Sequence, residues 1–165
     1  MKAKLLSSLL PLALVFTMVS CSSDATENPS VDVKLIENYD YNAAELEMAR
    51  LINEYRGSQG LSELATINHI SFKSLEHNEY MMENNVVNHD FFQERSQNII
   101  AVLGAVKVNE NVAYNYVAPQ NALNAWLASP GHKENIEGDF THFGISIIEN
   151  PVNGKKYYTN IFIKK

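Results

Sequence analysis

The sequence predicts an α+β domain. Segments with helical periodicity occupy much of residues 41–136, and two segments with strand-like alternation around a turn close the chain. Helices that precede such a hairpin are typical of a domain in which helices pack against an antiparallel sheet. The chain has one cysteine, Cys21, so the fold has to rest on its apolar core rather than on disulfide bonds.

Residues 1–20 have the features of a targeting segment, which is not part of the fold. Two lysines precede an apolar run over residues 5–19, which is shorter than the ~20 residues that a membrane-spanning helix needs. Ser20 then precedes Cys21, and this arrangement resembles the lipobox of bacterial lipoproteins. The resemblance implies cleavage before Cys21 and lipidation of Cys21. The alternative is a plain secretory signal peptide.

A lipid on Cys21 would anchor the protein to a membrane of the bacterial cell envelope, on its extracytoplasmic side. Residues 21–40 are polar, which predicts a flexible tether to a single domain of residues 41–165. Without residues 1–20, 11 Lys and Arg stand against 19 Asp and Glu, a net charge of −8. Such a chain repels phosphate backbones, so we expect no nucleic acid among its partners.

Four helices and one helical turn are predicted before the hairpin. The first covers residues 41–56, with Glu45 off its apolar stripe, and the glycines of residues 57–60 end it. The second covers residues 68–84. Its core candidates are Ile70, Leu75, Tyr80 and Met81, and its predicted surface residues are His69, Glu76 and His77.

The third helix is predicted over residues 96–104. The fourth begins at Pro119, because proline suits the first turn of a helix. Ser129 and Pro130 are predicted as the N-cap and first residue of a short helical turn over residues 131–136.

The strands are predicted from β-branched and aromatic content. Residues 106–116 are predicted to contain one short strand. Residues 142–149 and 155–164 form a hairpin around Asn150-Pro151-Val152-Asn153-Gly154, in which Asn-Gly beside a proline is a strong turn signal.

Three short polar segments carry candidate functional side chains: His89, Glu110 and His132. Two histidines and one carboxylate are a chemically sensible ligand set for zinc, with an open fourth position. They suit proton transfer equally well. Because His132 lies at the start of a helical turn, we expect its pKa to be lowered, which favours the neutral imidazole.

The same segments resemble the motifs of CAP domains, the cysteine-rich secretory, antigen five and pathogenesis-related class one proteins, also called SCP-like. Asn88-His89-Asp90-Phe91-Phe92, with Arg95 after it, is similar to the first histidine motif of the family. Asn109-Glu110-Asn111-Val112-Ala113 resembles the family's glutamate box. The segment from Trp126 to Ile136, WLASPGHKENI, resembles the signature of the bacterial branch.

The resemblance implies an α-β-α sandwich with a large cleft. In animal and plant members the cleft holds two histidines and two glutamates, and by motif His89, Glu110 and His132 are similar to three of these four. Ser129 stands where we expect the second glutamate, three residues after Trp126. The loss of one carboxylate argues for a reduced binding site more than for a full catalytic tetrad.

Other residues near these motifs have mainly structural interpretations. Asn111 is expected to hydrogen-bond backbone near the cleft, and Trp126 to lie in the core. Arg95 is expected to pair with a carboxylate such as Asp90, and the Ser129 hydroxyl to cap a helix rather than act as a nucleophile. His142 is a further cleft candidate, with a hydrogen-bonded histidine at a strand end as the alternative.

The sequence therefore favours a cleft that binds a divalent metal, with zinc first, or a small molecule or a lipid. One alternative is a hydrolase of peptides or esters, in which a histidine oriented by Glu110 activates water directly or through zinc. The other is a cell-surface module that binds a protein partner and retains a vestigial cleft.

Overall fold

A computed structural model describes residues 34–165 of the chain. The predicted signal peptide, the predicted lipidation site at Cys21 and most of the predicted tether lie outside the described residues. None of the helices within residues 34–165 has the length and the apolar composition needed to cross a membrane.

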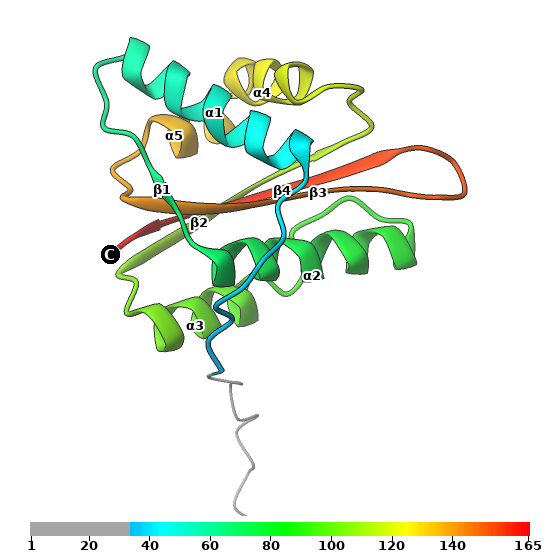
Figure 1. The fold of residues 1–165 in the computed structure, drawn as a ribbon, viewed down its shortest axis with the longest axis horizontal. Coiled ribbons are helices and arrows are strands. Elements are labelled where there is room, and N and C mark those ends of the chain that lie inside the picture. Colours follow the sequence, from blue (N-terminus) through cyan, green and yellow to red (C-terminus); the bar gives the residue numbers. More distant parts are fainter. Residues whose placement is uncertain (1–33) are drawn as a thin grey trace, which may run out of the picture. The chain divides into compact units, whose positions relative to one another are not determined.

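Five helices and four strands make up the described domain (Figure 1). The helices are α1 (Ala43–Ser58), α2 (Asn68–Asn84), α3 (Phe92–Leu103), α4 (Pro119–Ala128) and α5 (Pro130–Glu137). The strands are β1 (Ala65–Thr66), β2 (Lys107–Tyr114), β3 (His142–Glu149) and β4 (Lys156–Lys164). The predicted α+β class is confirmed, and only the two-residue strand β1 has no counterpart in the sequence prediction.

The four strands form one sheet in the order β1-β3-β4-β2. β4 pairs antiparallel with both β2 and β3, and β1 pairs parallel with the start of β3. Helices α2 and α3 cover one face of the sheet, while α1, α4 and α5 cover the other (Figure 1). The result is the three-layer α-β-α sandwich that the family resemblance implies.

Each face of the sheet has its own apolar core. On the side of α1, α4 and α5 the large buried side chains include Met48, Ile52, Trp126, Phe143 and Phe162. On the side of α2 and α3 they include Ile70, Ile99, Ile161 and Ile163. Adjacent residues of a strand point to opposite faces, so the alternation in β4 supplies both cores.

Beyond the end of β1, side chains hydrogen-bond the backbone N–H groups on the outer edge of β3. The Ser71 hydroxyl accepts a hydrogen bond from Ile145 N (3.1 Å), and Glu45 Oε1 accepts one from Ile147 N (2.9 Å). The other oxygen of Glu45 accepts from Asn42 N and completes a capping box with the N-cap residue Asn42. Glu45 is therefore buried, and its predicted place off the core-facing side of α1 is wrong.

One face of α2 is buried against the sheet. Ile70, Ser74, His77 and Met81 recur at the spacing of one helix face and are all buried. The predicted surface positions of His69 and His77 are wrong, whereas Glu76 is exposed as expected. The predicted core residues Leu75 and Tyr80 are only half-buried, since they lie beside this face.

Several predicted boundaries differ from the structure. α1 covers Ala43–Ser58, two residues later at each end than predicted. α3 begins at Phe92 instead of Ser96, because Phe91 reverses the chain with a left-handed backbone (φ 58°). Residues 36–39 of the predicted tether hydrogen-bond the domain: Ile36 N donates to His69 Nδ1 (3.2 Å), and the Tyr39 hydroxyl donates to Glu45 (2.8 Å). The packed domain thus starts before residue 41.

Substituting Gly144 tests how closely α2 lies on β3. A Cβ at Gly144 would stand 2.5 Å from the carbonyl carbon of Ile70, so the Gly144→Ala substitution forces α2 away from the sheet. We expect urea unfolding to show a loss of about 1–3 kcal/mol or more. Gly57→Ala, whose Cβ meets nothing within 4 Å, is the control and should not destabilise. Equal stability of the two variants would contradict the close approach.

Candidate functional site

Glu110 lies at the centre of β2, which is an outer strand of the sheet. The carbonyl groups of Glu110 and Val112 point away from β4 and accept hydrogen bonds from side chains of the helical layer, Asn135 Nδ2 (3.4 Å) and Trp126 Nε1 (3.0 Å). The Glu110 side chain points to the α2–α3 side, while the next residue, Asn111, points to the α5 side. Groups from both helical layers therefore meet at this edge.

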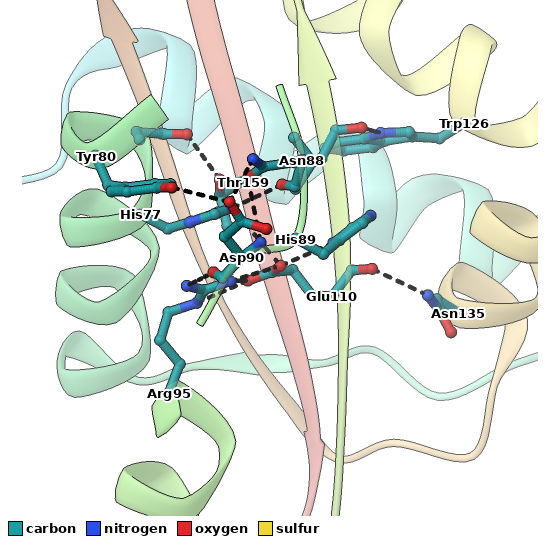
Figure 2. Close-up of polar contacts among 12 residues, drawn as sticks. His77, Tyr80, Asn88, His89, Asp90, Arg95, Glu110, Trp126, Asn135 and Thr159 are labelled. Carbon is teal, nitrogen blue, oxygen red and sulfur yellow. Dashed lines mark hydrogen bonds and ion pairs between the residues drawn. The ribbon is translucent and has the colours of Figure 1, made fainter. Parts of the chain in front are cut away.

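Arg95 holds the Glu110 carboxylate. Its Nε donates to Oε2 (3.0 Å) and its Nη2 lies 2.8–2.9 Å from both oxygens (Figure 2). Both side chains are buried. Such a two-nitrogen contact between a guanidinium and a carboxylate is strong and directional. Arg95 does pair with a carboxylate, as predicted, but its partner is Glu110; Asp90 offers only its backbone oxygen (2.7 Å).

The His89 segment between α2 and α3 is pinned at several points. Asp90 Oδ2 accepts hydrogen bonds from the Tyr80 hydroxyl (2.9 Å) and from Asn88 Nδ2 (2.8 Å). Phe91 then turns the chain into α3 through its left-handed backbone, a costly conformation for a residue with a side chain. The phenyl ring is 56% exposed and meets Tyr80 edge to face. These contacts fix the position of His89.

His89 donates from Nδ1 to Glu110 Oε1 across 2.8 Å. Because the carboxylate accepts this bond, the neutral ring carries its proton on Nδ1 and leaves the Nε2 lone pair available. Nε2 points away from Glu110 in Figure 2, and the side chain is 51% exposed. His89 thus presents an oriented acceptor, or base, to solvent.

His77 lies beneath this pair and was not predicted as a site residue. Its Nε2 donates to the Asn88 carbonyl (2.9 Å) and lies 3.8 Å from Glu110 Oε1. Its Nδ1 is buried without a hydrogen-bond partner among the described residues. Burial lowers the pKa of His77, which favours the neutral ring. The spacing of His77 from Ile70 and Met81, which places all three on one face of α2, is the sequence signal that could have indicated its burial.

His132 enters from the opposite side of β2, on the first turn of α5. Burial lowers the pKa of His132, and the charge of the nearby His89 lowers it further. The predicted lowering is therefore found, although its main cause is burial rather than the helix terminus. Asn111 Nδ2 donates to the His132 carbonyl (3.0 Å), and Asn135 Nδ2 donates to Asn111 Oδ1 (2.8 Å). These bonds tie α5 to β2.

A groove of about 290 Å³ adjoins His132. It runs between the end of β2 and α4, and its lining is Val112, Ala113, Tyr114, Tyr116, Ala125, Trp126, Ser129 and His132. Trp126 is buried as predicted and forms one wall. Ser129 is the N-cap residue of α5, but its side chain makes no capping hydrogen bond, so that part of the prediction is wrong.

The observed contacts do not fit the predicted zinc set. Arg95 occupies both oxygens of Glu110 and places a positive charge beside them, which disfavours a cation. Within residues 34–165, no group of three or more His, Cys, Asp or Glu side chains is placed to hold a metal ion. In this arrangement Glu110 orients His89, and it is not an available metal ligand.

His142 lies away from these residues. It begins β3, and its ring hydrogen-bonds the Thr141 hydroxyl (2.8 Å). It lines neither the groove beside His132 nor the surroundings of Glu110. The alternative interpretation, a hydrogen-bonded histidine at a strand end, describes its position.

An α-β-α sandwich that gathers two histidines and a glutamate at one sheet edge is the class of domain to which the CAP motifs point. The sequence model of the cysteine-rich secretory protein family, CAP, matches residues 49–162, and the chain belongs to this family.

Two relatives come from Bacillus subtilis (strain 168). The chain is 32% identical to the uncharacterized membrane protein YlbC, over 74% of this chain and 35% of that protein. It is 27% identical to the uncharacterized protein YkwD, over 66% of this chain and 44% of that protein. The chain therefore spans less than half the length of either relative.

Solved structures share the fold. An extracellular protein with an SCP domain from Bacillus anthracis has 27% identity and a TM-score of 0.66, over 74% of this chain and 40% of that one. An outer surface protein from Borrelia burgdorferi has 19% identity and a TM-score of 0.67, over 79% of this chain and 99% of that one.

Removing Arg95 should leave Glu110 as a buried charge without its partner. We expect the Arg95→Met substitution to lower the free energy of urea unfolding by about 3–5 kcal/mol. The double substitution Arg95→Met/Glu110→Leu should recover most of that loss. Arg50→Met, which breaks an exposed ion pair with Glu47, is the control and should have little effect. If Arg95→Met matches that control, the ion pair does not hold the site.

Proposed function

We propose that this CAP protein acts outside the cytoplasm in the bacterial envelope and binds a small amphipathic molecule, such as a lipid, at the edge of β2. The names of two structural neighbours, an extracellular protein and an outer surface protein, support the location. A predicted lipid on Cys21 would hold the domain at a membrane.

The groove beside His132 carries the binding proposal. One end presents the His132 ring, which burial keeps neutral, and the walls present Tyr114, Tyr116 and Trp126. Apolar walls with a few oriented polar groups are typical of small-molecule sites. A ligand with a polar head and an apolar body matches this lining, with its head at His132.

A second candidate function is hydrolysis, which the His89–Glu110 pair favours. Glu110 fixes the Nδ1 proton of His89 and stabilises the imidazolium, so Nε2 can take a proton from water while the water oxygen bonds to an acyl carbon. His89 then returns this proton to the amine or alcohol that leaves. Within the described residues, no nucleophilic side chain is hydrogen-bonded to His89, so water is the nucleophile.

Filling the groove tests the binding function. Isothermal titration calorimetry with dodecanoic acid, below its micelle concentration, should detect binding to the wild type. Ala125→Trp should abolish it, because the indole would occupy the groove. His132→Ala should weaken it about two- to tenfold, the loss of one hydrogen bond. Ala101→Trp, on the exposed face of α3, is the matched control and should bind normally. Unchanged binding by Ala125→Trp would contradict the proposal.

Hydrolysis is tested separately with peptide and ester substrates. Glu110→Gln and His89→Ala should each reduce turnover about 100-fold or more, the contribution expected of an oriented base. Urea unfolding should verify that both variants are folded. Glu94→Gln, an exposed change in the first turn of α3, should retain full turnover. Turnover that survives Glu110→Gln would eliminate the pair as its source.

A further inference from the structure

A second pocket lies on a different part of the domain and shares no lining residue with the groove. Its volume is about 410 Å³. Three segments form it: the chain after α1 (residues 60–63), the chain after α5 (residues 137–141) and Lys164 near the end of β4. Arg56, from the last turn of α1, also lines it.

Arg56 is 2% exposed and held rigidly. Its Nε donates to the Ser62 carbonyl (2.9 Å), and its Nη1 donates to the carbonyls of Ile136 (2.6 Å) and Gly138 (3.1 Å). These bonds secure the loop after α1 and the last turn of α5. They engage two of the three guanidinium nitrogens.

The third nitrogen, Nη2, has no hydrogen-bond partner within residues 34–165. Because Arg56 lines the pocket while the rest of its head group is engaged, Nη2 is the donor that it offers there. Burial lowers the pKa of Arg56, and the charge of Asp139 offsets this lowering only in part. An anionic group at Nη2 would offset the remaining cost of desolvation.

The other charges of the pocket distinguish between possible ligands. Asp139 is paired with Lys164 (2.6 Å), and Glu137 accepts from the Tyr55 hydroxyl (2.5 Å) and lies 3.6 Å from Lys133. Glu63 is exposed and has no ion pair or side-chain hydrogen bond among the described residues. Three acids against Arg56 and Lys164 leave the lining slightly negative, which disfavours a simple anion. A ligand that carries both signs satisfies Arg56 and Glu63 together.

We propose that this pocket binds a free amino acid with an apolar side chain. Its carboxylate accepts from Nη2 of Arg56, and its ammonium group lies at Glu63. Its side chain contacts Leu61 and Phe140, the large apolar residues of the lining. This site is independent of the cleft at β2, so failure of either proposal leaves the other standing.

NMR titration of the chain without residues 1–20 with L-leucine tests the site. Leucine should shift the backbone amides of residues 60–63 and 138–141 saturably. N-acetylleucine, which lacks the ammonium group, and leucinamide, which lacks the carboxylate, should bind more weakly. Glu63→Gln should weaken leucine binding about two- to fivefold, as expected for one exposed charge pair. Glu83→Gln, at an exposed position at the end of α2, should leave it unchanged.

Arg56→Lys is the second variant, because it keeps the positive charge. If it remains folded, it should lose leucine binding, since a lysine has no nitrogen left for the pocket after meeting the backbone carbonyls. Ala125→Trp should bind leucine normally. The proposal is overturned if leucine causes no saturable shift, or if its two blocked analogues bind equally well.

Discussion

A four-stranded sheet must satisfy the backbone groups along its two outer edges, and this requirement organises the domain. An edge that stays open invites pairing with another chain. At one edge β1 pairs with only the first part of β3, and Ser71 and Glu45 complete the edge. At the other edge, Trp126 and Asn135 bind the outward carbonyls of β2. Helices of the α4–α5 layer thus serve as edge protection.

The candidate site is a consequence of that protection. α4 and α5 approach β2 closely enough to reach its carbonyl groups, and α5 thereby brings His132 to the edge. From the other face Arg95 neutralises Glu110, which allows a carboxylate to remain buried there and to orient His89. Helices on opposite faces of the sheet therefore contribute side chains to one site.

The sequence predicts much of the fold because local signals and the fold agree. Pro119 starts α4, the Asn-Gly turn joins β3 to β4, and the bounds of α2 match those expected. The motif segments also predict which elements carry His89, Glu110 and His132. The main errors in the candidate site and in α1 concern polar residues with distant partners. His77 and Glu45 resemble surface residues until the strands that they face are known.

The choice between Asp90 and Glu110 as the partner of Arg95 shows the same limit. Asp90 is near in sequence, but Glu110 is reached only once β2 and α3 are packed together. The zinc prediction rests on residue types alone, and the guanidinium beside Glu110 cannot be seen from spacing. The role of a buried charge depends on which group it is paired with, and that pairing is set by the tertiary structure.

Trp126 gives the domain an intrinsic fluorescent probe. It is the only tryptophan in the chain, its indole N–H is bonded to the edge strand, and its ring lines the groove beside His132. Its fluorescence therefore arises from a single place, where the sheet edge and the groove meet. The emission wavelength of the unmodified protein should therefore report structural changes beside Trp126 without any label. Changes elsewhere in the domain should hardly alter this wavelength.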